Sequence, residues 1–141
     1  MNLKTIFAEW KSDSVMDETA ISQEALKIPV LHSKYLTMLS HCRLEYKNLL
    51  ESKRKLELTL EDYYEGRIDG KDIGRQPWQI EETKARVEKR IITDPEIVEM
   101  NLKIAREEEK VLVLKEIINN INQRNFQLKV SLDYLKWSNG G

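Results

Sequence analysis

Residues 93–121 read TDPEIVEMNLKIAREEEKVLVLKEIINNI, and this stretch decides the fold. It opens with a capping side chain, a proline suited to the first helical position and an acidic first turn, which together predict a helix start at Thr93–Glu96. Apolar residues then recur with a seven-residue period, and ten of the twelve a and d positions from Ile97 to Leu135 are apolar. The pattern predicts one long helix over residues 94–137 with a coiled-coil or bundle seam.

The seam of this helix predicts self-assembly. A helix of this length cannot bury its apolar stripe within one compact chain of 141 residues, and a hairpin of two such helices leaves apolar faces in water. We therefore expect a homo-oligomer, in which the polar seam residues Glu107 and Asn125 would fix register and subunit number. The residues expected to mediate oligomerisation are Ile97, Met100, Ile104, Val111, Leu114, Ile118, Ile121, Asn125, Leu128, Leu132 and Leu135.

A second long helix is predicted toward the N-terminus. Residues 30–64 contain neither glycine nor proline, and apolar residues recur at every seventh position from Tyr35 to Tyr63. Pro29 is expected to end or kink a preceding short helix for which Thr19 is a plausible N-cap. Leu3 to Trp10 form a further short amphipathic segment.

The two long helices are joined by a segment rich in glycine. Residues 65–80 read EGRIDGKDIGRQPWQI, which predicts a loop, whereas residues 81–92, with the stretch KARVEKRII, fit either a helix or an extended segment. We expect one all-α domain over residues 1–141, an elongated hairpin assembled into a ring-like homo-oligomer. Its parts are short helices in 1–29, a long helix in 30–64, a basic loop or linker in 65–93 and the heptad helix in 94–137.

Composition excludes several classes of protein. The 23 Lys and Arg against 24 Asp and Glu give a net charge of −1, so any polyanion-binding surface must arise from segregation of charge. The single cysteine, Cys42, excludes a disulfide framework. No apolar run approaches the roughly 18–20 residues that span a bilayer, and the first residues do not resemble a signal peptide.

Residue patterns offer little support for catalysis. His41, Cys42 and Glu45 share a helix face, but the sequence has no second His pair, no CxxC and no HExxH with which to complete a metal site. Gly70-Lys71 is not part of a phosphate-binding P-loop sequence. We therefore expect no catalytic residue, no metal and no cofactor.

Cations gather around the glycine-rich loop, with aromatic residues beside them. Such a combination suits a single nucleic-acid strand, because phosphates neutralise the charge and bases stack on the rings. The expected nucleic-acid-binding residues are Lys53, Arg54, Lys55, Tyr64, Arg67, Lys71, Arg75, Trp78, Lys84, Arg86, Lys89 and Arg90. The alternative is that these clusters are solvated helix faces, and that the chain is a non-enzymatic coiled-coil adaptor or scaffold that binds only proteins.

Four stretches in order resemble one family. Residues 24–35, EALKIPVLHSKY, are similar to the EALxIPxLHxKY stretch of the UvsY-like recombination mediators of T-even-type and cyanobacterial myoviruses. Met16–Thr19 resembles the IDxT entry of that family, Tyr63–Gly66 resembles its aromatic pair before a glycine, and Gln123–Lys129 resembles its RxFxIK signature. The resemblance covers essentially the whole chain.

The resemblance implies a non-enzymatic accessory protein of phage homologous recombination, repair and recombination-dependent replication. Such proteins form ring-like, hexamer-like homo-oligomers and bind single-stranded DNA in the cytoplasm of the infected bacterial host. They help a RecA-like recombinase to displace the phage single-strand-binding protein and to nucleate a presynaptic filament.

The chain departs from the family at one place. Members tend to carry Lys or Arg just before the aromatic pair, but residues 57–62 read ELTLED here and contain no cation. We expect the charge that contacts DNA to lie instead on Lys53, Arg54 and Lys55 or in the loop.

Overall fold

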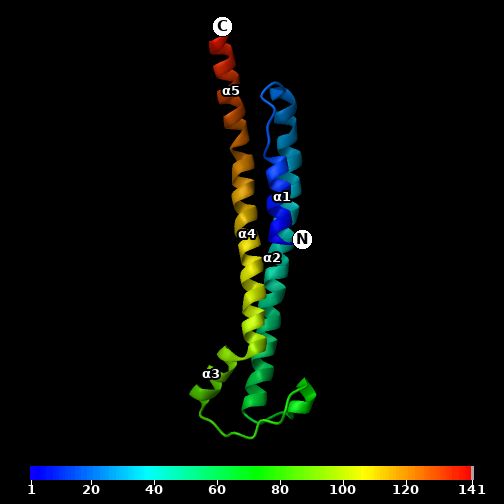
Figure 1. The fold of residues 1–141 in the computed structure, drawn as a ribbon, viewed down its shortest axis with the longest axis vertical. Helices are drawn as coiled ribbons and strands as arrows, with labels where there is room; N and C mark the ends of the chain where they lie inside the picture. The colour runs from blue at the N-terminus through cyan, green and yellow to red at the C-terminus, as the bar shows by residue number, and fades with distance from the viewer. Residues whose placement is uncertain (141) are drawn as a thin grey trace. The chain divides into compact units, whose positions relative to one another are not determined.

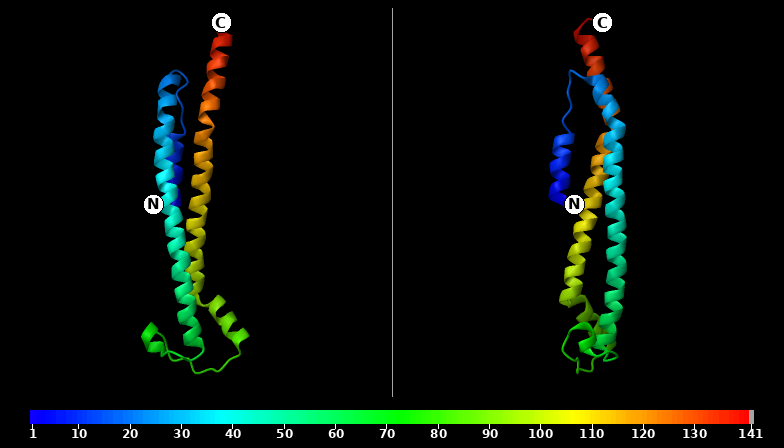
Figure 2. Two further views of the ribbon diagram at one scale, coloured as in Figure 1. Left: turned by 180° about the vertical axis from the view of Figure 1, so that it is seen from behind. Right: turned by 90° about the vertical axis from the view of Figure 1, so that its right-hand side faces the viewer.

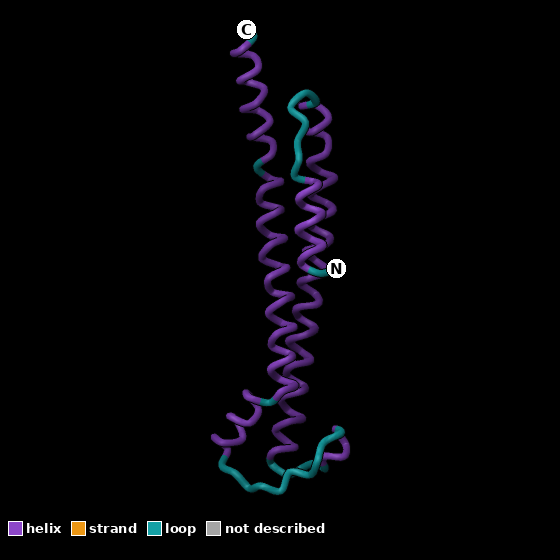
Figure 3. The backbone as a smooth tube through the Cα atoms, in the orientation of Figure 1, coloured by secondary structure: helices purple, strands orange, loops and turns teal. Residues whose placement is uncertain are grey.

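The computed structural model describes residues 1–140, and it confirms the all-α prediction. Within these residues the backbone contains no strand (Figure 3). The helices are α1 (Leu3–Asp13), α2 (Ile21–Tyr64), the 3-10 helix η1 (Gly70–Ile73), α3 (Lys84–Thr93), α4 (Pro95–Asn122) and α5 (Arg124–Ser138) (Figure 1). The chain divides into two compact units, Met1–Leu44 with Glu107–Gly141 and Glu45–Arg106, which are described separately below.

The first unit packs α1 against the N-terminal part of α2 and the C-terminal part of α4 (Figure 2). Asn2 begins α1 by accepting a hydrogen bond from the Thr5 N–H at 2.8 Å. Buried side chains from all three helices form the core of this unit. They are Ile6, Leu31, Tyr35, Leu39, Cys42, Leu114, Ile117 and Ile121. Part of the heptad seam is therefore buried by the chain's own α1 and α2.

Helix α2 passes through Pro29 without ending, so of the two outcomes expected at this proline, a helix end or a kink, the helix end is absent. Proline removes one backbone donor, which leaves the Ala25 carbonyl without its helical partner. Both residues are exposed, so water can hydrate that carbonyl, while Leu31 and Tyr35 beyond the proline stay anchored in the core. Thr19 is not the cap either, because its N–H and hydroxyl both donate to the Asp17 carboxylate, at 2.9 and 2.6 Å.

The expected heptad helix is divided at Gln123 into α4 and α5. Arg124, the first residue of α5, is 3 % exposed and contacts both other parts of the unit. Its Nη2 donates to the Asp13 carbonyl at 2.9 Å, and its guanidinium lies 5.5 Å from the centre of the Trp10 ring. Its Nη1 lies 4.0 Å from Oε2 of the buried Glu24 on α2.

The second unit has its own core at the end of α2. Leu60, Tyr63 and Tyr64 pack against Val87 of α3 and Ile97 of α4. Helix α2 ends at Tyr64, and the turn that follows contains Gly66, whose φ of +76° suits glycine. The following loop turns tightly at Gly70, where an added Cβ would lie 2.5 Å from the Gln76 carbonyl oxygen.

Of residues 81–92, for which the sequence left helix and extended segment open, residues 84–92 belong to α3 and residues 81–83 precede it. Thr83 begins this helix by accepting a hydrogen bond from the Arg86 N–H at 3.3 Å. The helix start predicted at residues 93–96 is confirmed, because Asp94 accepts a hydrogen bond from the Glu96 N–H at 2.9 Å and Pro95 is the first residue of α4. The segment expected as a basic linker thus contains η1 and α3.

Candidate nucleic-acid interface

All twelve expected nucleic-acid-binding residues belong to the second unit, on α2, the loop and α3. The structure separates them into two groups. One group is held in ion pairs or hydrogen bonds within the chain, and the other presents its charge to solvent. The distinction matters because a cation already paired with a carboxylate attracts phosphate less strongly.

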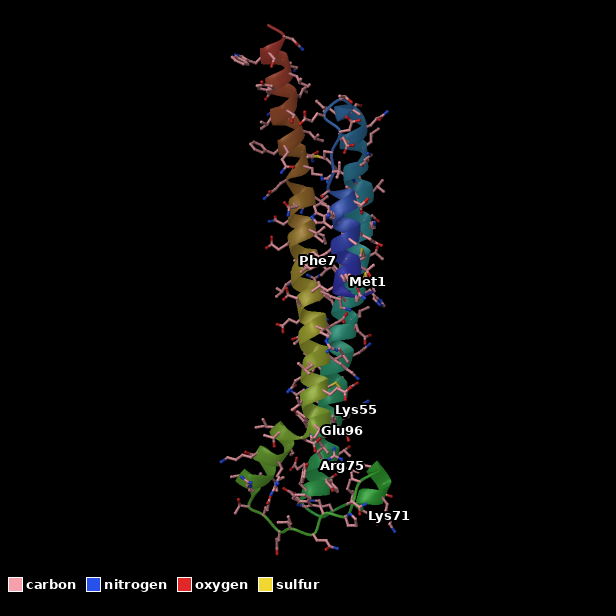
Figure 4. All side chains as sticks on the ribbon, viewed as in Figure 1. Met1, Phe7, Lys55, Lys71, Arg75 and Glu96 are labelled. Carbon is pink, nitrogen blue, oxygen red and sulfur yellow. The ribbon has the colours of Figure 1, made fainter. Side chains whose placement is uncertain are left out.

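Asp94 is the centre of the first group. Its side chain is fully buried, and Arg75 donates to both of its oxygens, from Nη1 to Oδ2 at 2.6 Å and from Nη2 to Oδ1 at 2.8 Å. Arg75 Nη2 also donates to Glu96 at 2.7 Å, and both residues are labelled in Figure 4. The Tyr64 hydroxyl donates to Asp94 at 2.6 Å. Arg75 and Tyr64 therefore tie the loop and the end of α2 to the start of α4.

Protonation in this cluster follows from burial and hydrogen bonding. Burial acts to raise the pKa of Asp94, but the hydrogen bonds from Arg75 and Tyr64 outweigh it and hold that pKa below 3.8. Burial, together with the hydrogen bond to Asp94, raises the pKa of the Tyr64 phenol to about 12. The carboxylate is ionised and the phenol protonated at neutral pH.

Trp78 lies at the boundary between the two groups. Its ring meets that of Tyr64 edge to face, with centroids 4.9 Å apart, and the Arg90 guanidinium stacks 5.0 Å from the Trp78 centroid. Arg90 also donates to Glu82 through Nη2 at 2.7 Å. The buried indole Nε1 has no hydrogen-bond partner within residues 1–140.

Three further cations also have acidic partners. Lys53 lies 3.8 Å from Glu57, and Arg54 lies 3.3 Å from Glu51. Arg67 pairs with Asp62 at 3.0 Å and with Glu65. These pairs are largely exposed, so each contributes little to stability and can exchange its partner at low cost.

The second group carries cations that make no ion pair in the described part of the chain. It consists of Lys55 on α2, Lys71 on η1, and Lys84, Arg86 and Lys89 on α3. Arg86, Lys89 and Arg90 line one side of α3 around a hollow of about 330 Å³. We call Arg86, Lys89 and Arg90, together with the Trp78 ring on which Arg90 stacks, the α3 cationic face. Lys84, in the first turn of α3, does not line this hollow.

The anchoring carboxylates could not be found by sequence inspection. The sequence predicts Asp94 and Glu96 only as parts of a helix start, a cap and an acidic first turn, and it predicts no role for Glu82. Asp94 lies 19 residues from Arg75, and no periodic pattern joins the two positions. The cap motif TDPE was the one available signal for Asp94, and it gives no indication of a second role.

Residues 1–140 contain neither a cluster of metal-binding side chains nor a membrane-spanning helix. No group of three His, Cys, Asp or Glu side chains within residues 1–140 is placed to hold a metal ion. Among the helices described above, none combines the length and apolar character required to cross a bilayer.

Comparison with known proteins identifies one family. A family model described as "Recombination, repair and ssDNA binding protein UvsY" matches residues 9–141. No curated protein sequence gives a significant match.

Solved structures share the fold. One crystal structure of the bacteriophage T4 recombination mediator protein UvsY, lattice type IV, is 22% identical, covers 97% of this chain and 99% of that chain, and has a TM-score of 0.85. A second, lattice type II, is 23% identical, covers 98% of each chain and has a TM-score of 0.82.

Proposed function

Because the chain belongs to the UvsY family of recombination, repair and ssDNA binding proteins, we propose that it is a phage recombination mediator that holds single-stranded DNA on the α3 cationic face. The observation that supports this proposal is that Lys84, Arg86 and Lys89 of α3 are exposed and make no ion pair within residues 1–140. Unpaired cations attract phosphates and release counterions when DNA binds.

The other residues expected to bind nucleic acid are proposed to act in different ways. Lys55 and Lys71 extend the set of unpaired cations, and Lys53, Arg54 and Arg67 can exchange exposed acidic partners for phosphate. Trp78 offers the exposed part of its ring to a base, with Arg90 stacked on it. Arg75 and Tyr64 act by position, because their polar groups already bind Asp94.

We further propose a homo-oligomer, a hexamer-like ring, that repeats this face around a closed assembly. Several residues of the predicted seam are buried within the chain: Ile97, Leu114, Ile121 and Leu128. The subunit contact is therefore formed by apolar side chains that remain exposed. On α5 these are Phe126, Val130, Leu132, Tyr134, Leu135 and Trp137. A repeated weak site gives high avidity without a strong site on any subunit.

The proposed partners are a RecA-like phage recombinase and the phage single-strand-binding protein, in the cytoplasm of the infected host. The mechanism is a competition for the strand: DNA held on the mediator binds the single-strand-binding protein less well and becomes available to the recombinase. No catalytic residue and no cofactor are part of this proposal.

The salt dependence of DNA binding tests the proposal. Fluorescent oligo-dT and its matching duplex are titrated with the full chain across a salt series, for wild type and for Lys84→Ala/Arg86→Ala/Lys89→Ala. Each lost phosphate contact lowers the slope of log K against log salt by about 0.7 for a single strand. We expect a preference for the single strand and a slope smaller by about 2 in the triple variant.

A matched variant provides the control. Lys4→Ala/Lys11→Ala/Lys115→Ala removes the same charge from exposed positions in the first unit. It is expected to keep the wild-type slope. If the α3 variant also keeps that slope, DNA lies elsewhere; if the oligomer binds neither DNA, the adaptor function replaces the mediator function.

A further inference from the structure

A second hollow lies on the other side of α3, between that helix and the last turns of α2. It has a volume of about 550 Å³, and Leu58, Ile91 and Ile92 supply its apolar lining. Leu58 is 64% exposed and Ile92 is 68% exposed. Ile91 packs against the core of the second unit, whereas Leu58 and Ile92 leave most of their apolar surface in water.

Carboxylates stand on both walls of this groove. Glu57 and Glu61 lie four residues apart on α2, one helical turn along the same face, and Glu88 lies on α3. Glu61 and Glu88 make no ion pair in the part of the chain described here. Glu57 is 3.8 Å from Lys53, and the one cation of the lining, Arg54, is paired with Glu51.

The carboxylates of the groove favour a cationic peptide segment over nucleic acid as its binding partner. Carboxylates on two walls repel a phosphate backbone, so this side of α3 does not suit nucleic acid. An apolar strip between two rows of carboxylates is complementary to a segment whose leucine or isoleucine side chains are flanked by lysine or arginine. Burial of exposed apolar area drives such docking, and the charges set its orientation.

We propose that this groove, the α2–α3 groove, docks a cationic, leucine- or isoleucine-bearing segment of a partner protein. Helix α3 then separates two binding surfaces of opposite charge, with cations toward one hollow and Glu88 toward the other. The docking surface is separate from the α3 cationic face, because the two hollows beside α3 share only Ile92. Arg54, the one cation of the groove that the DNA-binding proposal also uses, is paired with Glu51.

Binding of defined peptides to the full chain tests this inference. The probe is a fluorescein-labelled helical peptide built from leucine and lysine, with two matched peptides in which serine replaces leucine or glutamate replaces lysine. We expect only the leucine–lysine peptide to bind. Binding should weaken about tenfold in Glu61→Gln/Glu88→Gln, and Leu58→Ser should weaken it comparably.

The control variant is Glu18→Gln/Glu108→Gln, which removes two carboxylates that are exposed in the first unit. Equal weakening in this control, or equally tight binding of the serine–lysine peptide, would show only general attraction of cations and would overturn the inference. Single-stranded DNA affinity is measured on the same variants and should not fall. Loss of DNA binding by wild type with peptide binding intact would therefore refute the DNA proposal alone.

Crosslinking identifies the occupant directly. A photo-reactive benzoylphenylalanine placed at position 58 should form an adduct with the leucine–lysine peptide, detected by mass spectrometry. An adduct with a second copy of this chain that the peptide does not displace would overturn the inference, since the groove would then be a subunit contact.

Discussion

Asp94 joins three parts of the second unit through one carboxylate. It accepts hydrogen bonds from Arg75 of the loop, Tyr64 of α2 and the backbone of Glu96 in α4. A buried carboxylate is costly unless such partners satisfy it. The Arg75–Asp94 contact therefore orders the loop that joins the end of α2 to the α3 cationic face.

Removal of the Asp94 charge should destabilise the protein strongly. Asp94→Asn removes the buried carboxylate of the Arg75 ion pair and leaves Arg75 paired only with the exposed Glu96, and breaking a partly buried pair of this kind costs about 3 kcal/mol. Urea unfolding followed by circular dichroism measures the loss. The matched change Glu99→Gln breaks an exposed pair with Lys103 and should cost less than about 0.5 kcal/mol. Similar losses in the two variants would contradict the central role of Asp94.

Tyr64 should make the protein sensitive to alkaline pH. Its folded-state pKa of about 12 lies above the ordinary value of 10.0, so the folded chain holds the phenolic proton more tightly than the unfolded chain. This contribution is complete below pH 10 and is lost as pH rises from 10 toward 12. Thermal unfolding across that range should show a steeper fall in Tm for wild type than for Tyr64→Phe. Parallel curves would rule out this linkage.

At the scale of the elements, periodicity predicted the helices better than their ends. The heptad repeat and the TDPE cap predicted α4 from its first residue, because both signals are local. The break at Gln123 lies beside Arg124, which donates a hydrogen bond to Asp13, a contact across 111 residues that no local pattern predicts. Helix α3 was left open because its ten residues are too few for its apolar period to decide.

Pro29 offers a test of helix continuity. It interrupts the hydrogen bonding of α2 at an exposed position, where no packing contact offsets the loss. Pro29→Ala should therefore stabilise the protein, by an amount up to the roughly 3 kcal/mol that separates the two residues in a helix interior. Thermal unfolding by circular dichroism measures the change. Leu26→Ala, at another exposed position of α2, should shift Tm little, and a lower Tm for Pro29→Ala would contradict this account.

For the whole molecule, basic and acidic residues are nearly equal in number but are not evenly distributed along the chain. The 23 basic and 24 acidic residues cancel, yet α3 alone carries four cations against one carboxylate. Composition could therefore exclude a strongly basic protein but could not locate a basic face. Local counting did place Lys84, Arg86 and Lys89 among the candidates. It could not show that Arg75 and Tyr64 are engaged by Asp94, because that requires the folded loop.

The homo-oligomer is predicted to form through exposed apolar residues of α5. Leu132 and Leu135 are partly exposed on α5, so replacing both with serine should leave the subunit folded and weaken the oligomer. Sedimentation should show a smaller species, and affinity for single-stranded DNA should fall at least about tenfold as avidity is lost. Leu26→Ser, at an exposed position of α2, is the control and should sediment as wild type. An unchanged mass for Leu132→Ser/Leu135→Ser would move the subunit contact away from α5.

The anchoring of Arg124 links the two ends of the sequence. Its guanidinium rests on Trp10 and on the backbone of Asp13, so the first turn of α5 depends on the presence of α1. A protease that clipped the chain after residue 13 would remove both supports while leaving every residue of α5 intact. Loss of α1 would therefore destabilise the first turn of α5. An amino-terminal fusion that displaces α1 would have the same effect.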